Sequence, residues 1–267
     1  MRPAPRRPAA LGAPGGWTRA PLAGDAGRMT ARASLPFDRA AVDAVSLDVG
    51  GVMVVPDHGM LGHALTVAGV PHDRVRFDEG HYVAMAEVDR ARSEPEVVTD
   101  YVVAFLRAVG VPEADVPAAA RALEPVLVAP VWHQPLPGAR AAAARLADAG
   151  LCLAVTSNSN GTVADLLRRH EILQVGPGPG AEVAHISDSG VVGVHKPDAA
   201  MFEATAAGLE LPLGRICHIG DAGGYDADGA AAAGMLAVHV DPLGLCPADH
   251  VHVASLADFA DRLLGVG

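Results

Sequence analysis

The most constraining feature of the sequence is a short apolar segment that ends in an aspartate and two glycines. Residues 42–55 read Val-Asp-Ala-Val-Ser-Leu-Asp-Val-Gly-Gly-Val-Met-Val-Val, and Asp48 follows the apolar run. Such a run is typical of a strand buried on both faces of a parallel sheet. A carboxylate at the end of a buried strand is costly without a partner, and ligands bind at this edge of open α/β sheets. Asp48 therefore marks either a ligand site or a simple turn.

Apolar segments alternate with helical patterns along the rest of the chain. Strands are predicted at 151–155, 183–186, 191–194, 215–219 and 236–240. Helices are predicted at 138–150, 161–170, 196–209, 224–234 and 256–264, and residues 174–180 are predicted to form a loop. Strands that alternate with helices predict an α/β fold with a doubly wound, Rossmann-like parallel sheet.

Residues 57–134 differ from this pattern, because they contain four helical patterns and no strand pattern. Val70-Pro71 separates the first of these helices from the second, and Val111-Pro112 separates the third from the fourth. We interpret the segment as a helical cap inserted after the first strand. The core domain would then comprise residues 39–56 and 135–267.

Charge and composition narrow the possible functions. Residues 1–39 carry seven arginines and two acids, a net charge of +5, and the remainder carries −16, which together give the total of −11. Residues 1–38 are rich in Pro, Arg, Ala and Gly and are predicted to be a disordered leader; Met29 is an alternative start. The acidic body argues against nucleic-acid binding.

Two further features concern the compartment. The sequence contains no apolar run approaching the ~20 residues that a membrane helix needs, so no membrane association is expected. The three cysteines form no CxxC pair, which predicts a reducing, cytoplasmic compartment and no structural zinc.

Polar residues follow several of the predicted strands. Ser157 follows the second strand, Lys196 lies just beyond a short strand, and Asp221 with Asp226 follows the strand at 215–219. Each alone is explained by helix capping or a surface charge. Because a parallel sheet brings its carboxyl ends to one edge, these groups and Asp48 are expected to converge. Lys196 is the sole lysine among twenty basic residues.

The chemistry of these groups is coherent. Carboxylates and a backbone carbonyl form an oxygen site that suits Mg²⁺. A hydroxyl, an ammonium and amides at a helix start can hold phosphoryl oxygens. Asp48 is then a candidate covalent nucleophile that forms an aspartyl-phosphate.

These segments together resemble the haloacid dehalogenase-like (HAD) hydrolase superfamily, in particular phosphatase-type members with a helical cap inserted after the first strand. The resemblance covers about residues 42–241. It rests on Leu47-Asp48-Val49-Gly50-Gly51-Val52, Thr156-Ser157-Asn158, Lys196-Pro197-Asp198, and Gly220-Asp221 with Asp226.

The resemblance implies a Mg²⁺-dependent phosphoric-monoester hydrolase acting on a small phosphorylated metabolite. Asp48 would be the nucleophile, and Ser157 and Lys196 would assist it. The implied substrate-binding residues are Ser157, Asn158 and Lys196, and the implied metal ligands are Asp48, the Gly50 carbonyl, Asp221 and Asp226. The sequence identifies neither the particular substrate nor the oligomeric state.

Gly50 departs from the family pattern, since phosphatases of this family usually carry a second Asp two residues after the nucleophile as general acid/base. Such a group contributes about 10²–10⁴-fold to the rate. Asp57 and His58, at the junction with the cap, are candidate replacements, and ordinary linker residues are the alternative. Cap residues His81, Tyr82 and Arg90 are candidates to line the pocket.

Three readings therefore stay open. The first is the Mg²⁺-dependent phosphatase. The second is a catalytically weak HAD fold that serves as a phosphometabolite-binding or regulatory module, as Gly50 suggests. The third is a metal-free dehalogenase, which also lacks the second Asp, although Asp221 and Asp226 favour a metal.

Overall fold

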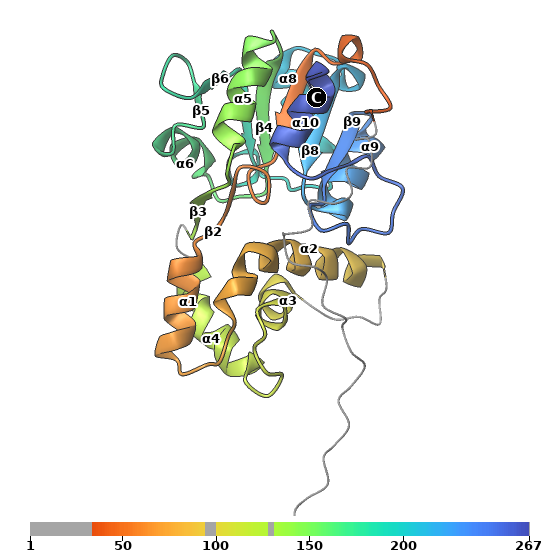
Figure 1. The fold of residues 1–267 in the computed structure, drawn as a ribbon. Coiled ribbons are helices and arrows are strands. Elements are labelled where there is room, and N and C mark those ends of the chain that lie inside the picture. The colour runs from red at the N-terminus through yellow and green to blue at the C-terminus, as the bar shows by residue number, and fades with distance from the viewer. Residues whose placement is uncertain (1–33, 94–99, 128–130, 267) are drawn as a thin grey trace, which may run out of the picture. The chain divides into compact units, whose positions relative to one another are not determined.

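Six parallel strands form the central sheet of the computed structural model, which describes residues 34–93, 100–127 and 131–266 (Figure 1). The strand order is β10-β9-β8-β1-β4-β7. These strands are β1 (Ala44–Leu47), β4 (Cys152–Ser157), β7 (His185–Asp188), β8 (Ile216–Gly220), β9 (Leu236–Val240) and β10 (His252–Val253). The predicted α/β fold is confirmed. Residues 1–33 of the predicted leader lie outside the described residues.

The register of the sheet places the ends of its central strands side by side. β1 lies between β4 and β8, and Leu47 is opposite both Val155 and Ile219. Asp48 follows Leu47 directly, and Asp221 follows the last residue of β8. The two carboxylates therefore emerge at the same edge of the sheet.

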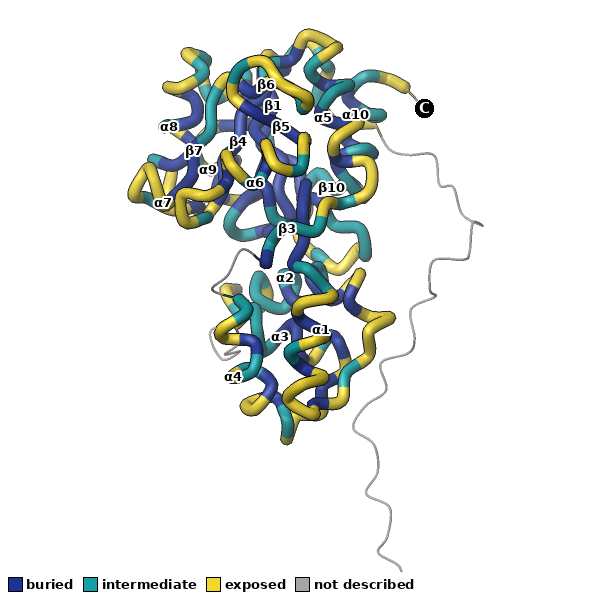
Figure 2. Tube along the Cα trace, turned by 90° about the vertical axis from the view of Figure 1, so that its left-hand side faces the viewer, coloured by how far each residue is buried: buried dark blue, intermediate teal, exposed yellow. Residues whose placement is uncertain are grey.

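Helices cover both faces of the sheet. They are α5 (Ala139–Asp148), α6 (Val163–Arg169), α7 (Ser189–Val192), α8 (Ala199–Leu209), α9 (Asp228–Ala233) and α10 (Leu256–Leu264). Successive side chains of a strand point to opposite faces, so Val45 and Leu47 join the cluster that includes Leu146 of α5, whereas Ala44 joins Phe202 of α8. The strands of the sheet are buried along most of their length (Figure 2).

The segment between β1 and α5 forms a helical unit with its own apolar cluster. Its helices are α1 (His58–Val67), α2 (Phe77–Ser93), α3 (Tyr101–Ala108) and α4 (Val116–Leu127). An antiparallel pair of short strands, β2 (Val54–Pro56) and β3 (Trp132–Pro135), carries the chain out of the core and back. Among the described residues, no helix combines the length and apolar character needed to cross a bilayer.

Two local predictions are wrong. Residues 191–194, predicted as a strand, form no strand: Val191 and Val192 end the short helix α7, where Asp188 accepts a hydrogen bond from Gly190 N and Gly193 follows with a positive φ. A four-residue apolar run does not distinguish a strand from a helix. The predicted loop at 174–180 begins within β5 (Leu173–Val175), which pairs in parallel with β6 (Ala181–Val183).

Candidate active site

Three buried carboxylates meet at the carboxyl edge of the sheet. One oxygen from each of Asp48, Asp221 and Asp226 lies within 4.8 Å of the others. Asp48 follows β1, Asp221 follows β8, and Asp226 lies in the π-helical turn Gly223–Ala227. The structure thus brings together the three aspartates that the sequence analysis selected.

The single lysine of the chain lies between two of these carboxylates. Lys196 Nζ is 3.0 Å from Asp48 Oδ1 and 2.5 Å from Asp226 Oδ1, and the residue is only 3% exposed. The carboxamide of Asn158 fixes the lysine backbone, because Asn158 Oδ1 accepts from Lys196 N at 2.8 Å and Asn158 Nδ2 donates to Lys196 O at 3.0 Å. The Asn158 side chain therefore positions Lys196 in this structure; a contact with substrate stays a prediction.

The two carboxylates bonded to Lys196 differ in acidity. Burial raises the pKa of Asp226, but Lys196 and a hydrogen bond from His218 outweigh burial and hold that pKa below its ordinary value. Burial raises the pKa of Asp48 to about 7, because the nearby charges of Asp226 and Asp221 add to it and Lys196 only partly opposes it. Of these two carboxyls, Asp48 is therefore the more readily protonated.

The donor set fits a divalent cation. When all three aspartates are ionised, one ammonium balances one of three negative charges, and a divalent ion would balance the other two. Carboxylate oxygens are the ligands that Mg²⁺ prefers. Both oxygens of Asp226 already accept hydrogen bonds, from Lys196, His218 and Ala222 N. The oxygens of Asp48 and Asp221 are therefore more available as metal ligands.

The two remaining predicted residues also lie at this edge. The Gly50 carbonyl accepts a hydrogen bond from Val52 N at 2.7 Å and closes the turn after β1, so its role as a metal ligand stays a prediction. Ser157 is the last residue of β4, 5% exposed and opposite Asp188 of β7. The Asp188 carboxylate accepts from Gly161 N at 2.9 Å, which anchors the loop that follows Ser157.

Helix α2 of the inserted segment lies directly over the carboxylates. His81 Nε2 is 2.7 Å from Asp221 Oδ2, and the Tyr82 hydroxyl donates to Gly51 O at 3.0 Å. Asp89 accepts from the backbone N–H groups of Gly223 and Gly224 at 2.7 and 3.0 Å. Two of the three candidate cap residues, Tyr82 and Arg90, line a cavity that also includes Asp221. The third, His81, contacts the Asp221 carboxylate directly. The exposed Arg90 also pairs with Glu87 of its own helix at 2.6 Å.

The place beside Gly50 is occupied by an indole ring. A Cβ atom built at Gly50 would lie 3.2 Å from Cζ3 of Trp132, which is the first residue of β3. The Trp132 ring also packs edge-on against His81, with ring centroids 5.3 Å apart. Since the Trp132–Gly50 contact joins segments more than eighty residues apart, no local sequence signal predicted it.

The two candidate replacements for the missing acid/base lie elsewhere. Asp57 caps α1 by accepting from Met60 N at 2.6 Å, and His58 Nδ1 is 3.4 Å from Asp78 Oδ1. Of the described cap histidines, His81 contacts a carboxylate of the site, whereas His58 contacts Asp78. The imidazole of His81 is therefore the better placed proton carrier.

Sequence reasoning also missed His218. This buried residue of β8 contacts Asp226 through Nε2 at 3.0 Å and Ser46 Oγ through Nδ1 at 3.0 Å. Burial lowers the pKa of His218 and favours the neutral ring. A histidine within the apolar run Ile216-Cys217-His218-Ile219 was the available signal, since a buried polar side chain needs a partner.

The fold and site define an α/β protein with an acidic centre at the carboxyl edge of its sheet. The family model for haloacid dehalogenase-like hydrolases matches residues 42–234, and the chain belongs to this family. A comparison with curated protein sequences found no match.

Several solved structures share the fold. The putative HAD-hydrolase YfnB from Bacillus subtilis, bound to magnesium, matches with a TM-score of 0.56 at 20% identity, over 83% of this chain and 98% of that one. A HAD phosphatase from Thermococcus onnurineus matches with a TM-score of 0.52 at 17% identity, over 84% and 98%. The L-2-haloacid dehalogenase RSc1362 matches with a TM-score of 0.51 at 14% identity, over 84% and 99%. At these identities the likeness concerns the fold alone.

Proposed function

We propose that this HAD-like hydrolase is a Mg²⁺-dependent phosphatase that hydrolyses phosphoric monoesters of a small metabolite. The observation that carries the proposal is the buried group of Asp48, Asp221 and Asp226 around one ammonium, Lys196. A dehalogenase that works without metal has no need for two further carboxylates beside its nucleophile. Their uncompensated charge instead favours a site for a divalent cation and a phosphoryl group.

Each polar group has a role in this mechanism. The Asp48 carboxylate attacks phosphorus, and the phosphoryl group is transferred to its oxygen while the alcohol leaves. The Lys196 ammonium favours the ionised form of Asp48 and attracts the phosphoryl oxygens, to which Ser157 donates a hydrogen bond. Mg²⁺, held by Asp48, Asp221 and Asp226, would neutralise charge between nucleophile and phosphate. Water then attacks phosphorus and releases Asp48.

A direct test is hydrolysis of p-nitrophenyl phosphate by the purified full-length protein, with Mg²⁺ and with chelator, beside release of halide from a 2-haloacid. The proposal expects phosphate release only with Mg²⁺ and no halide release. Halide release in the presence of chelator would identify a dehalogenase. Binding of phosphorylated metabolites without turnover would identify the binding module.

The proton for the leaving alcohol is assigned to His81, which α2 places 2.7 Å from Asp221. We expect His81→Ala to lower kcat by about 10²-fold, the usual contribution of a general acid/base. The matched controls Asp57→Ala and His58→Ala should stay near wild type. Because His81 also contacts a proposed metal ligand, the pH profile of kcat is needed: His81→Gln should lose one limb of it. A loss in His58→Ala equal to that in His81→Ala would contradict the assignment.

Metal binding should depend on pH, because Asp48 must lose its proton before it binds a cation. The pKa of Asp48 is raised to about 7 in the metal-free site, so the affinity for Mg²⁺ should fall about tenfold per pH unit below pH 7 and level off above it. Isothermal titration calorimetry in two buffers of different ionisation enthalpy measures the released proton. Asp221→Ala should abolish binding; equal binding by the variant would refute the ligand assignment.

Gly50 motivates the second candidate function, a phosphometabolite-binding module with weak turnover. The variant Gly50→Asp places at position 50 the second carboxylate of the family pattern. This change alone should not raise kcat, because a Cβ at position 50 would lie 3.2 Å from Cζ3 of Trp132. The double variant Gly50→Asp/Trp132→Ala should be faster than the Trp132→Ala control. A Gly50→Asp enzyme tenfold faster than wild type would contradict this expectation, since it would show that the Trp132 ring moves aside for the new carboxylate.

A further inference from the structure

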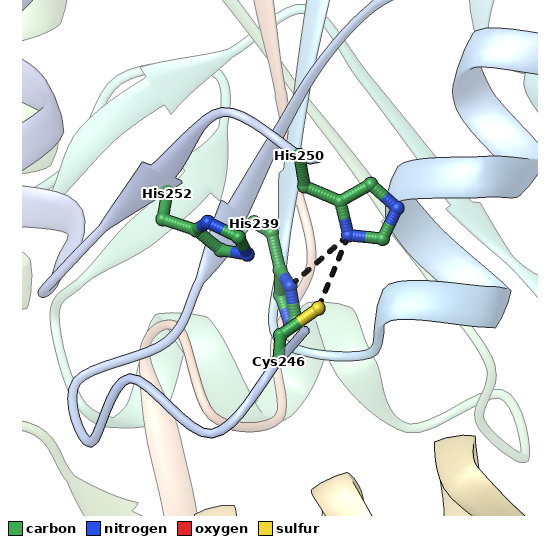
Figure 3. Close-up of side chains that lie close together, drawn as sticks. All are labelled: His239, Cys246, His250 and His252. Atoms are coloured by element: carbon green, nitrogen blue, oxygen red, sulfur yellow. Dashed lines mark hydrogen bonds between the residues drawn. The ribbon is translucent and has the colours of Figure 1, made fainter. Parts of the chain in front are cut away.

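A second cluster of potential metal ligands lies beside the carboxylates, at the carboxyl end of β9. It consists of His239 on β9, Cys246 and His250 on the loop after it, and His252 on β10 (Figure 3). One ring nitrogen of each histidine and the cysteine sulfur lie within 4.8 Å of one another. Figure 3 shows the four side chains gathered from both strands and the intervening loop.

Two imidazoles of this cluster face each other through their Nδ1 atoms. His239 Nε2 lies 3.1 Å from Asp221 O and His250 Nε2 lies 3.0 Å from Asp228 Oδ1. Because a carbonyl and a carboxylate only accept, both Nε2 atoms carry hydrogen. In the neutral rings both Nδ1 atoms therefore bear lone pairs, and they are 3.4 Å apart. The Cys246 thiol, 3.5 Å from His250 Nδ1, can donate to one of them but not to both.

The third histidine of the cluster has a vacant nitrogen. Among the described residues, His252 Nε2 is a buried atom that has no hydrogen-bond partner. Burial, with His239 and His250 close by, lowers the pKa of His252, which favours the neutral ring, in which one of the two nitrogens bears a lone pair. Buried nitrogens of this kind need an explanation, and an absent ion is one.

We propose that His239, Cys246, His250 and His252 bind one Zn²⁺ ion. Zinc takes four nitrogen and sulfur ligands in a tetrahedron, with bonds of about 2.0–2.1 Å to nitrogen and about 2.3 Å to sulfur. Such a tetrahedron has ligand-to-ligand edges of about 3.4 Å between nitrogens and about 3.6 Å between nitrogen and sulfur. The observed separations of 3.4 and 3.5 Å match these edges. The remaining ligand atoms lie within 4.8 Å of one another, so zinc binding would draw His252 closer to the other three residues.

The surroundings of the cluster support a metal that is distinct from Mg²⁺. Burial raises the pKa of the Cys246 thiol, and bound zinc would displace its proton. The Asp228 carboxylate on His250 and the Asp221 carbonyl on His239 orient the two rings, as outer-shell partners do at zinc sites. Imidazole and thiolate donors select zinc, whereas the carboxylate site selects harder cations.

The ion would have a structural consequence for the neighbouring cavity. The loop between β9 and β10 lines a cavity of about 660 Å³ together with Tyr82 and Asp89 of α2 and with Asp221. Zinc would fasten this loop to both strands, so it would fix one wall of the cavity. The proposal does not depend on the phosphatase assignment, since its test reads metal binding and not turnover.

The test uses the chelator-stripped full-length protein in excess Mg²⁺, which occupies the carboxylate site. Titration with Co²⁺ should give one equivalent of bound metal with the visible bands of tetrahedral cobalt and a thiolate-to-cobalt charge-transfer band, and Zn²⁺ should displace it. Cys246→Ser should lose the charge-transfer band, and His252→Gln should bind at least about tenfold more weakly. Asp228→Asn should bind about 10–100-fold more weakly. The half-buried Cys152 and the exposed His63 supply the controls Cys152→Ser and His63→Gln, which should behave as wild type.

Thermal unfolding provides a second measurement. Zn²⁺ should raise the Tm of the wild type and both controls in excess Mg²⁺, and should raise the Tm of Cys246→Ser and His252→Gln clearly less. The proposal is overturned if the wild type shows no charge-transfer band, if Cys246→Ser retains it, or if Zn²⁺ stabilises Cys246→Ser and wild type equally.

Discussion

Replacing Asp48 by asparagine is expected to lower kcat by about 10⁴-fold or more, because a carboxamide cannot replace a carboxylate as nucleophile. The substitution preserves shape and an oxygen that can accept from Lys196, whose Nζ lies 3.0 Å from Asp48 Oδ1. The fold should therefore survive. Steady-state hydrolysis of p-nitrophenyl phosphate measures the loss, and a thermal unfolding curve checks that the variant is folded.

The same variant tests the covalent step. Acid-quenched wild-type enzyme should carry a phosphoryl group on the peptide that contains Asp48, detected by mass spectrometry, and Asp48→Asn should carry none. The matched control is Asp43→Asn, an aspartate just before β1 that pairs with Arg215 at the surface. An Asp48→Asn enzyme that retains a tenth of wild-type turnover would exclude Asp48 as nucleophile.

Removing the charge of Lys196 is expected to cause the largest loss of stability. Lys196→Met leaves Asp48 and Asp226 without their cation at a site where Lys196 is 3% exposed. Deleting one partner of a buried ion pair costs about 3–5 kcal/mol. Urea unfolding with chelator at pH 7 measures this cost. It should shrink as pH falls, because protonation of the two carboxyls removes their repulsion.

An exposed ion pair provides the control for the stability of the Lys196→Met variant. Arg215 and Asp43 form a pair with side chains 40% and 45% exposed, and Arg215→Met should change stability far less, since solvent screens such pairs. The variant Lys196→Arg keeps the positive charge and changes the shape of the side chain. The planar guanidinium is too wide for this buried position. We expect it to lose about 10²-fold or more in kcat while remaining folded. Near-wild-type turnover in Lys196→Arg would exclude the proposed contact with the phosphoryl group.

The proposed active site combines residues of the core with residues of the inserted helical segment. Asp48, Lys196 and Asp226 come from the core, whereas His81 and Asp89 come from α2. Asp89 accepts hydrogen bonds from Gly223 N and Gly224 N, and burial raises its pKa. These contacts tie α2 to the turn that carries Asp226. The position of α2 over the site therefore depends on residues outside the family motifs.

The sequence alone determined the central sheet and the acidic centre of the site. Apolar runs that end in Asp48 and in Gly220-Asp221 are local signals, and parallel pairing necessarily brings their carboxyl ends to one edge. The isolated Lys196 was recognisable because it is the chain's only lysine. Short apolar runs were ambiguous, as α7 at Ser189–Val192 shows.

Only the tertiary structure decided what surrounds that centre. Trp132 beside Gly50 and His81 on Asp221 are contacts between residues far apart in the chain. Neither contact leaves a periodic signal, because each depends on how the inserted helices pack against the core. The cluster that includes Cys246 also leaves no CxxC pattern in the sequence, since its other three residues are histidines brought together by β9, β10 and their loop. Strand ends are placed by local patterns, whereas contacts across the cap and loops are placed by packing.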